Sequence, residues 1–159
     1  MRTIIILIIL VIATTTTSCE KDTATICENL LEQGSTDATL LKGEWELEYF
    51  ARTLNGKNYR WEVAPSFQTD LNFNDTTFQA SVRNVMYGNY YVDEQSNEIS
   101  FMSTLITEVG VTEEQGNLED KYFNAIKNSV CFVIVDENKL MIHYKEDIDG
   151  KNILIFRKK

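Results

Sequence analysis

Histidine, proline and positive charge are scarce in this chain of 159 residues, which has one His, one Pro and 15 Lys and Arg against 24 Asp and Glu. A single imidazole excludes most zinc hydrolase centres and Ser-His-Asp triads, which need histidine as a ligand or a general base. The formal charge of −9 argues against a nucleic-acid binder, because affinity for phosphate backbones comes from clustered Lys and Arg. The 43% hydrophobic content is typical of one globular domain with an additional segment.

The additional segment is residues 1–18, which have the pattern of a cleavable export signal. The apolar run from Ile4 to Ala13 is shorter than the roughly 20 residues that a transmembrane helix needs. Cys19 then follows two small residues, an arrangement that resembles the lipobox of bacterial lipoproteins, in which the cysteine receives the lipid. Thr16 stands where Leu is usual, as in the looser boxes of the Bacteroidetes. The alternative is an ordinary secretory signal with an incidental cysteine.

Lipid is the expected means by which the mature chain attaches to a membrane. Removal of residues 1–18 takes away Arg2 and no acid, so 14 basic residues remain against 24 acidic ones and the formal charge becomes −10. Such a surface gains nothing from anionic headgroups, so acyl chains must provide the affinity. We therefore expect an outer-membrane lipoprotein. The stretch Glu20-Lys21-Asp22 resembles short cell-surface signals but also suits any solvated tether, which leaves the periplasmic and the surface-exposed face open.

Two further cysteines, Cys27 and Cys131, remain after lipidation. An oxidising compartment permits a disulfide between them, and closing a loop of about 100 residues is worth several kcal/mol in the chain-entropy model. Two cysteines also occur often as small buried hydrophobes. The sequence leaves both alternatives open.

The mature chain divides into a tether over residues 19–38 and a β-rich domain over residues 39–159. An apolar stripe that begins at Ile26 predicts a short helical segment in the tether. The domain shows short alternating runs separated by turn residues, and a helix over about residues 117–128 precedes the last three strands. We therefore expect a β-rich α+β fold: a strongly curled antiparallel sheet or small barrel of about 7–8 strands with one inserted helix.

Hairpins connect most of the expected strands. In the first strand, alternation places Trp45, Leu47 and Tyr49 on one buried face. Asn55-Gly56 suits the tight turn that follows, because both turn residues must reach positive φ. Further hairpins are expected at the polar turns Asn74-Asp75-Thr76, 93–97 and Asp149-Gly150.

A set of motif residues runs through the domain in order: Gly43 and Trp45 in the first strand, then Asn84, Gly88 and Tyr90 in an N-x-x-x-G-x-Y pattern, Glu119, Phe123 and Ile126 in the helix, and Leu140-x-Ile142 and Leu154-x-Phe156 in the closing strands. From about Leu40 onward the chain thereby resembles a META domain, the module of the HslJ family. The resemblance implies structural roles, with Gly88 allowing close packing or an unusual backbone conformation and Tyr90 a buried aromatic. It also implies links to envelope stress, antibiotic tolerance or secretion, with no chemistry to transfer.

Cys131 and His143 form the one candidate Cys-His dyad. A hairpin that pairs Val135 with Leu140 places the two side chains on opposite faces, with Cys131 in the core and His143 at the surface. Asp149-Gly150 lacks the other ligands of a calcium loop, and the acidic residues near the helix start suit the helix dipole. We predict no catalytic residues, no metal site and no cofactor.

Two functions fit these observations. The first is a non-enzymatic outer-membrane lipoprotein whose META-like domain has a binding or protective role in envelope stress, with its protein or small-molecule partner unknown. The second is a lipocalin-like carrier of a small apolar ligand, because lipocalins also open with the Gly43-x-Trp45 pattern. A carrier needs an empty apolar cavity, and a lipocalin usually places its helix after nearly all of its strands.

Overall fold

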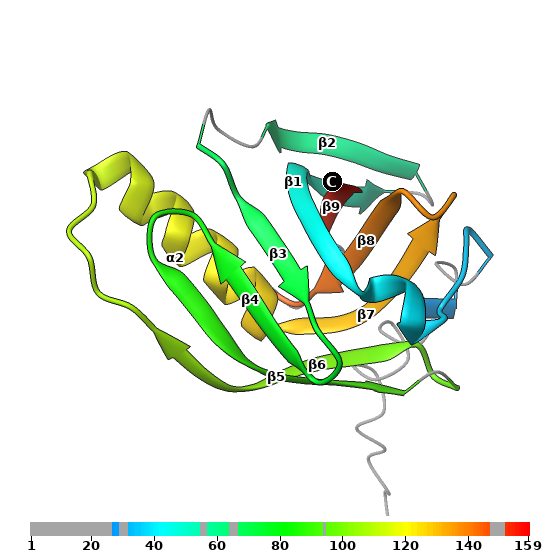
Figure 1. Cartoon of the computed structure of the whole chain (residues 1–159). Coiled ribbons are helices and arrows are strands. Elements are labelled where there is room, and N and C mark those ends of the chain that lie inside the picture. Colours follow the sequence, from blue (N-terminus) through cyan, green and yellow to red (C-terminus); the bar gives the residue numbers. More distant parts are fainter. Residues whose placement is uncertain (1–26, 29–31, 55–56, 64–66, 94, 147–151) are drawn as a thin grey trace, which may run out of the picture.

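The computed structural model describes residues 27–28, 32–54, 57–63, 67–93, 95–146 and 152–159 (Figure 1). This part of the chain contains a short 3-10 helix, η1 (Ala38–Leu41), and the helix α2 (Glu113–Lys127). The strands are β1 (Gly43–Leu54), β2 (Lys57–Val63), β3 (Asp70–Phe73), β4 (Thr77–Ser81), β5 (Val85–Asp93), β6 (Glu98–Ile106), β7 (Ser129–Val135), β8 (Lys139–Tyr144) and β9 (Asn152–Lys158).

The strands form a closed antiparallel barrel. Their order is β2-β1-β3-β4-β5-β6-β7-β8-β9, and β9 also pairs with β1. Eight strands therefore complete the ring, while β2 is an additional strand that pairs with β1 only. The helix α2 precedes the last three strands, so the predicted small barrel with one inserted helix is confirmed.

The predicted hairpins define the register of the barrel. Phe73 pairs with Phe78 across the β3–β4 turn, and Asp93 pairs with Glu98 across the β5–β6 turn. Leu54 pairs with Lys57, as a two-residue turn requires, although Asn55-Gly56 itself lies outside the described residues. Asp149-Gly150 and most of the expected tether helix also lie outside them, with Cys27 and Glu28 described as helical.

Large side chains fill the barrel interior. Trp45, Phe50, Phe73, Phe78 and Phe132 are each at most 1% exposed. Aromatic rings meet edge to face inside the barrel, as in the pair formed by Phe78 and a β6 phenylalanine, whose ring centroids are 4.6 Å apart. These side chains belong to one continuous core cluster that also includes residues of α2.

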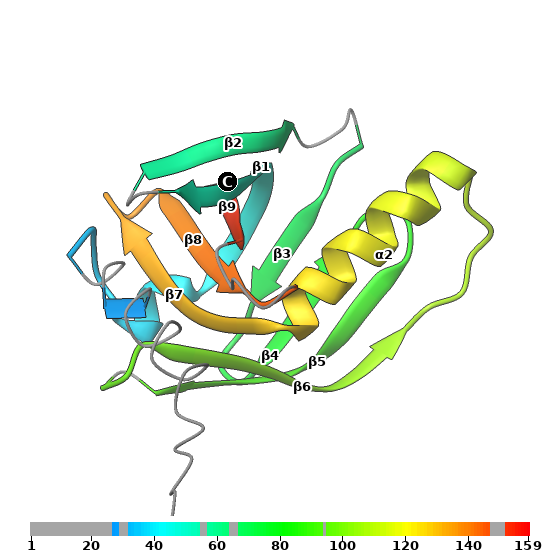
Figure 2. The ribbon, with the colours of Figure 1, turned by 180° about the vertical axis from the view of Figure 1, so that it is seen from behind.

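The helix α2 closes the side of the barrel interior that the strands leave open. Figure 2 shows it in front of β4 and β5, and it also contacts β6. Tyr122 and Ile126 point into the same core cluster as the strand residues, and the Tyr122 hydroxyl donates a hydrogen bond to the Asp70 carbonyl oxygen on β3 at 3.0 Å. Thr112 caps the helix and forms a capping box with Gln115, which satisfies backbone groups at its first turn.

A second apolar cluster lies on the outside of the barrel, where β7, β8, β9 and β1 meet. Its members are Cys27, Ala51, Cys131, Val133, Met141, Ile153 and Ile155. The strands β7, β8 and β9 are therefore buried on both faces over most of their length, which is why their sequences are nearly continuous apolar runs rather than alternating ones.

The expected placement of Cys131 and His143 on opposite faces is wrong. Val135 pairs with Lys139, so the register differs by one residue from the expected one and Cys131 pairs directly with His143. A slip of one residue moves a side chain to the other face of the sheet. His143 is consequently fully buried rather than at the surface, and Cys131 belongs to the outer cluster rather than to the interior.

The expected alternation of the first strand also fails at one point. Trp45 and Leu47 are buried inside the barrel as predicted, but the register of β1 against β9 shifts between Leu47 and Tyr49. A β-bulge adds one residue to a strand and reverses the alternation beyond it. Tyr49 therefore packs against the outer cluster, and Phe50 takes the inward position.

Candidate functional site

Two residues of the motif set, Asn84 and Glu119, meet in a buried hydrogen-bond network. The Asn84 amide N–H donates to Oε1 of Glu119 at 2.5 Å, and its Nδ2 donates to Oε2 at 2.8 Å. The Arg83 N–H donates to the same carboxylate at 2.9 Å. Buried polar groups are destabilising unless they are hydrogen-bonded, and here both partners are. The network joins the β4–β5 connection to α2.

The same asparagine also holds the segment that leads from β6 to the helix. Its Nδ2 donates to the Val109 carbonyl oxygen at 3.1 Å, and its Oδ1 accepts a hydrogen bond from the Val109 N–H at 2.6 Å. Thr107 Oγ1 donates to the same Oδ1 at 3.3 Å and accepts from the Val85 N–H at 2.9 Å. Asn84 is thus a structural clamp between three segments: the β4–β5 connection, the segment after β6, and α2.

A surface hollow opens beside this clamp. It has a volume of about 410 Å³ and is lined by Asn84, Ile106, Thr107, Glu108, Val109, Gly110, Glu119, Asp120 and Phe123. This lining includes three apolar side chains, Ile106, Val109 and Phe123, and three acidic ones, Glu108, Glu119 and Asp120. The hollow therefore suits a group that is apolar along its length and positively charged at its end.

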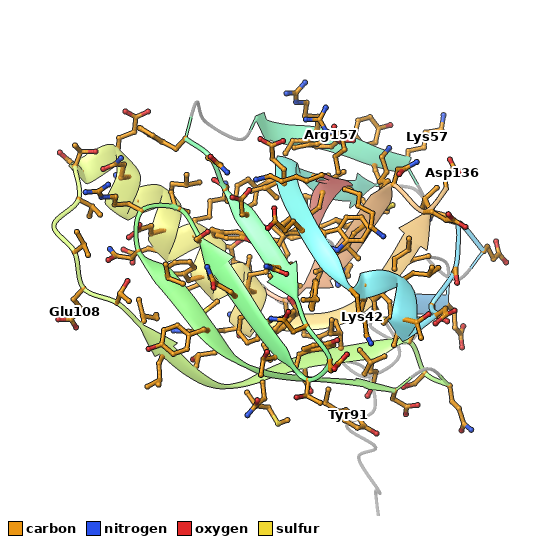
Figure 3. The ribbon with its side chains drawn as sticks, in the orientation of Figure 1. Lys42, Lys57, Tyr91, Glu108, Asp136 and Arg157 are labelled. Carbon is orange, nitrogen blue, oxygen red and sulfur yellow. A yellow bond between two sulfur atoms is a disulfide. The ribbon has the colours of Figure 1, made fainter. Side chains whose placement is uncertain are left out.

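An exposed apolar surface adjoins the hollow. We define the outer strip as Tyr87, Tyr91, Met102 and Leu105, whose side chains are 44% to 61% exposed. Tyr87 pairs with Leu105 and Asn89 pairs with Met102, so the four residues share the outward face of β5 and β6. Figure 3 shows Tyr91 projecting away from the barrel. The same face also carries the exposed polar residues Asn89 and Ser100, which pair with Met102 and Tyr91. Exposed apolar side chains that gather on one face make it a candidate interaction site.

The outer cluster is covered by an N-terminal strap, which is the described residues 27–28 and 32–35. A disulfide joins Cys27 to Cys131, with Cα atoms 5.9 Å apart. Ser35 and Ile134 exchange two backbone hydrogen bonds of 2.8 Å. Gly34 lies so close to β7 that a Cβ atom there would overlap the Ile134 carbonyl oxygen. The strap thus attaches to the strand through a covalent bond, a backbone bridge and close packing.

His143 lies next to this disulfide on the covered face. Neither of its ring nitrogens has a hydrogen-bond partner among the described residues. Burial, with a smaller contribution from the positive charge of Lys145, lowers the pKa of His143 from 6.5 to about 4. The imidazole is therefore neutral at pH 7, and the sulfur of Cys131 is already bonded to Cys27. Cys131 and His143 therefore face one another but do not make a catalytic dyad. The cysteine has no free thiol, and the imidazole is buried.

The remaining motif residues have structural surroundings. Gly43 has φ +113°, a backbone conformation that glycine adopts readily and other residues rarely do. The Trp45 Nε1–H donates to the Leu41 carbonyl oxygen at 2.7 Å. Gly88 has no such positive φ and pairs with Phe78 on β4.

Tyr90 was expected to be a buried aromatic, but it is half-buried at the edge of the core. Its ring packs edge to face on Phe73, with centroids 4.9 Å apart. Its hydroxyl donates to the Asn74 carbonyl oxygen at 2.9 Å. The hydroxyl reaches the surface at the β3–β4 turn, because a phenolic side chain keeps its polar end where partners are available.

Other predicted features fall partly or wholly outside the described part. Cys19 lies outside it, so the expected lipidation stays a prediction. Within the described ranges, no helix is long and apolar enough to cross a membrane. Those same ranges contain no group of three or more His, Cys, Asp or Glu side chains that could hold a metal ion.

These features define a small closed β-barrel with an aromatic-rich core, one packed helix and an exposed apolar strip on β5 and β6. No family model matches the chain, and no curated protein matches it. The crystal structure of a DUF4847 family protein from Bacteroides vulgatus has 16% sequence identity and a TM-score of 0.55, over 76% of this chain and 94% of that one. An NMR structure of a protein from Burkholderia xenovorans has 17% identity and a TM-score of 0.56, over 76% and 85%. Identities this low show a shared fold alone.

The sequence indicated parts of this site but not the site itself. Asn84 and Glu119 were each selected as motif residues, yet nothing in their spacing of 35 residues indicates that they touch. The alternation along one strand does indicate that Tyr87, Asn89 and Tyr91 share a face of the sheet. That pattern does not tell which face is inward, and the tyrosines could equally have been core residues.

Proposed function

We propose that the protein is a non-enzymatic, lipid-anchored binding module of the bacterial outer membrane, with a META-like barrel that recognises its partner through its outer surface. The observation that supports this most is the contrast between the packed interior and the exposed outer strip. A binding protein exposes apolar surface where its partner docks. In this barrel such surface lies outside, next to the hollow.

The carrier alternative has less support from the same observation. A lipocalin-like carrier holds its ligand in an apolar cavity of several hundred Å³ inside the barrel. The interior of this barrel holds Trp45, Phe50 and Phe132 together with the inner face of α2. Native mass spectrometry of protein purified from its host separates the two functions. A stoichiometric small molecule would favour the carrier, and its absence would favour the binding module.

The non-enzymatic assignment rests on the surroundings of the reactive side chains. Cys131 is disulfide-bonded and His143 is fully buried. The Glu119 carboxylate already accepts three hydrogen bonds from the β4–β5 connection. A general base must reach a proton of the substrate, and each of these groups is instead occupied or covered.

Replacement of Cys19 by Ala tests the anchor. The variant should move from the membrane fraction to the soluble fraction, and the wild-type chain should carry an acyl mass on its mature N-terminus. The matched control is Ser18→Ala, which keeps the cysteine and should stay with the membrane. Membrane association that is unchanged in Cys19→Ala, together with no acyl mass on the wild type, would refute the lipid anchor.

A further inference from the structure

The imidazole of His143 is buried without a partner beside the disulfide between Cys27 and Cys131. Its side chain is fully buried, and neither ring nitrogen has a hydrogen-bond partner among the described residues. An unpaired polar group inside a protein is destabilising, and buried polar side chains are paired in the large majority of cases. A state of the chain in which the imidazole has a partner would explain its presence.

Before the disulfide forms, the thiol of Cys131 supplies such a partner. Cys131 pairs directly with His143 across β7 and β8, and directly opposed residues have Cβ atoms about 4.5 to 5.5 Å apart on one face of the sheet. The thiol hydrogen is then within reach of a ring nitrogen that can accept it. Once Cys131 bonds to Cys27, its sulfur has no hydrogen left to donate. The unpartnered imidazole is what this step leaves behind.

The strap has noncovalent contacts that place Cys27 beside β7. The Asn97 Nδ2 donates to the Cys27 carbonyl oxygen at 3.2 Å, and Asn97 is itself fully buried. Further along the strap, Ser35 and Ile134 form their backbone bridge. Holding two reacting groups in the right geometry raises their effective concentration. A docked strap therefore presents Cys27 to Cys131 before a covalent bond joins them.

From these observations we propose that His143 is the base that closes the disulfide between Cys27 and Cys131. It acts once, on the chain's own sulfur, and has no role after the bond has formed. This inference goes beyond the proposed binding function and does not depend on the lipid anchor. It gives His143 a task in the maturation of the chain, although the finished protein has no free thiol beside it.

The closing reaction needs a disulfide oxidant, such as glutathione disulfide, which takes the two electrons that the two thiols lose. Exchange first joins one glutathione to Cys27, which is the more exposed of the two cysteines, and the other glutathione leaves as a thiol. The Cys131 sulfur then gives its proton to His143 and attacks the Cys27 sulfur. The bond between Cys27 and glutathione breaks, and the second glutathione leaves as a thiolate, which takes up the proton that His143 holds.

The surroundings of His143 favour the neutral imidazole, which is the form that accepts a proton. The side chains of the outer cluster on β7, β9 and β1 carry no charge. Tyr49 of β1 packs on the same cluster, and Glu28 of the strap is exposed to solvent. Burial and the positive charge of Lys145 lower the pKa of the imidazole. His143 can therefore take the thiol proton at pH 7, which produces the thiolate that attacks a disulfide.

The rate of closure tests the inference on the chain purified from its host in nonionic detergent. The disulfide is reduced with a dithiol, and glutathione disulfide is then added in excess, so that the intramolecular step limits the rate. Samples are quenched with acid and alkylated, and the peptides that contain Cys27 and Cys131 are measured by mass spectrometry. At pH 7, His143→Leu should close at least about tenfold more slowly than the wild type. At pH 9, above the usual thiol pKa of about 8.5, the two rates should agree within about twofold.

Two further variants separate proton transfer from packing. His143→Gln keeps a polar side chain but cannot take up a proton, so it should close as slowly as His143→Leu. Met141→Leu changes a side chain of the same strand and the same outer cluster. It conserves volume and should close at the wild-type rate.

The wild type also provides a test that needs no variant. Without a base, closure should become about tenfold faster with each pH unit until the thiol ionises near pH 8.5. With His143 as the base, the rate should level off between about pH 6.5 and 8.5. Any of four results would overturn the inference: equal rates of wild type and His143→Leu at pH 7, a defect that persists at pH 9, an equal defect in Met141→Leu, or a wild-type profile without the plateau.

Discussion

Removal of the disulfide between Cys27 and Cys131 should lower the free energy of unfolding by about 4 to 5 kcal/mol. The bond joins residues separated by 104 positions, and in the chain-entropy model a loop of about 100 residues restricts the unfolded chain by about 4.7 kcal/mol at 25 °C. Small domains are stable by only about 5 to 15 kcal/mol. The loss is therefore large enough to leave the barrel marginally stable.

Urea denaturation followed by tryptophan fluorescence measures this difference, because Trp45 is fully buried in the folded barrel. The variant Cys27→Ala removes the bond from the strap and leaves Cys131 in place. The urea concentration at the midpoint of unfolding should be well below that of the oxidised wild type. When a dithiol reductant is added to the wild type, its midpoint should match that of the variant. Alkylation of the unreduced, denatured wild type should modify neither cysteine. A stability difference below about 1 kcal/mol, or two alkylated thiols, would refute the reasoning.

Three further predictions concern single residues. The pKa of His143 is lowered from 6.5 to about 4 in the folded state. The contribution of this residue to the free energy of unfolding should therefore be constant above pH 6.5 and fall by about 3 kcal/mol as the pH decreases to 4. In urea titrations at different pH values, the variant His143→Leu should lack this decrease. Asn84→Ala should destabilise the barrel by about 2 to 3 kcal/mol, because it leaves buried partners unpaired; a calorimetric melting temperature equal to wild type would contradict the clamp. Gly34→Ala should destabilise by about 1 to 3 kcal/mol through overlap with β7, whereas Gly110→Ala, with no atom within 4 Å of its added Cβ, should change urea stability little.

The barrel could be predicted from the sequence because its hairpins have strong local signals. Turn residues and alternation placed the strands around Phe73, Phe78 and Val85, and the polar face of α2 defined the helix. The register of β7 against β8 could not be predicted in the same way. Both strands are apolar on both faces, so no polar alternation distinguishes one register from the next. The turn is also one residue shorter than expected, with Asp136 and Glu137 at positive φ.

The candidate site could be predicted less well than the fold. The clamp depends on a contact between Asn84 and Glu119, which belong to segments that only the closed barrel brings together. The outer cluster depends on the strap, whose position is determined by Cys27 and by the close approach of Gly34 to β7. Long-range contacts of this kind leave no periodic pattern in the sequence, whereas a strand or a helix does.

Site-specific photo-crosslinking in the native envelope tests most directly whether the barrel binds through its outer surface. A photoreactive side chain replaces Leu105 in the outer strip, 61% exposed, or Tyr59 on β2, 51% exposed, as the matched control. The proposal predicts a discrete protein adduct from position 105 and none from position 59, with the adduct reduced in the variant Asp120→Lys, which reverses a charge in the hollow. Adducts of equal yield from both positions, or none from position 105, would contradict it.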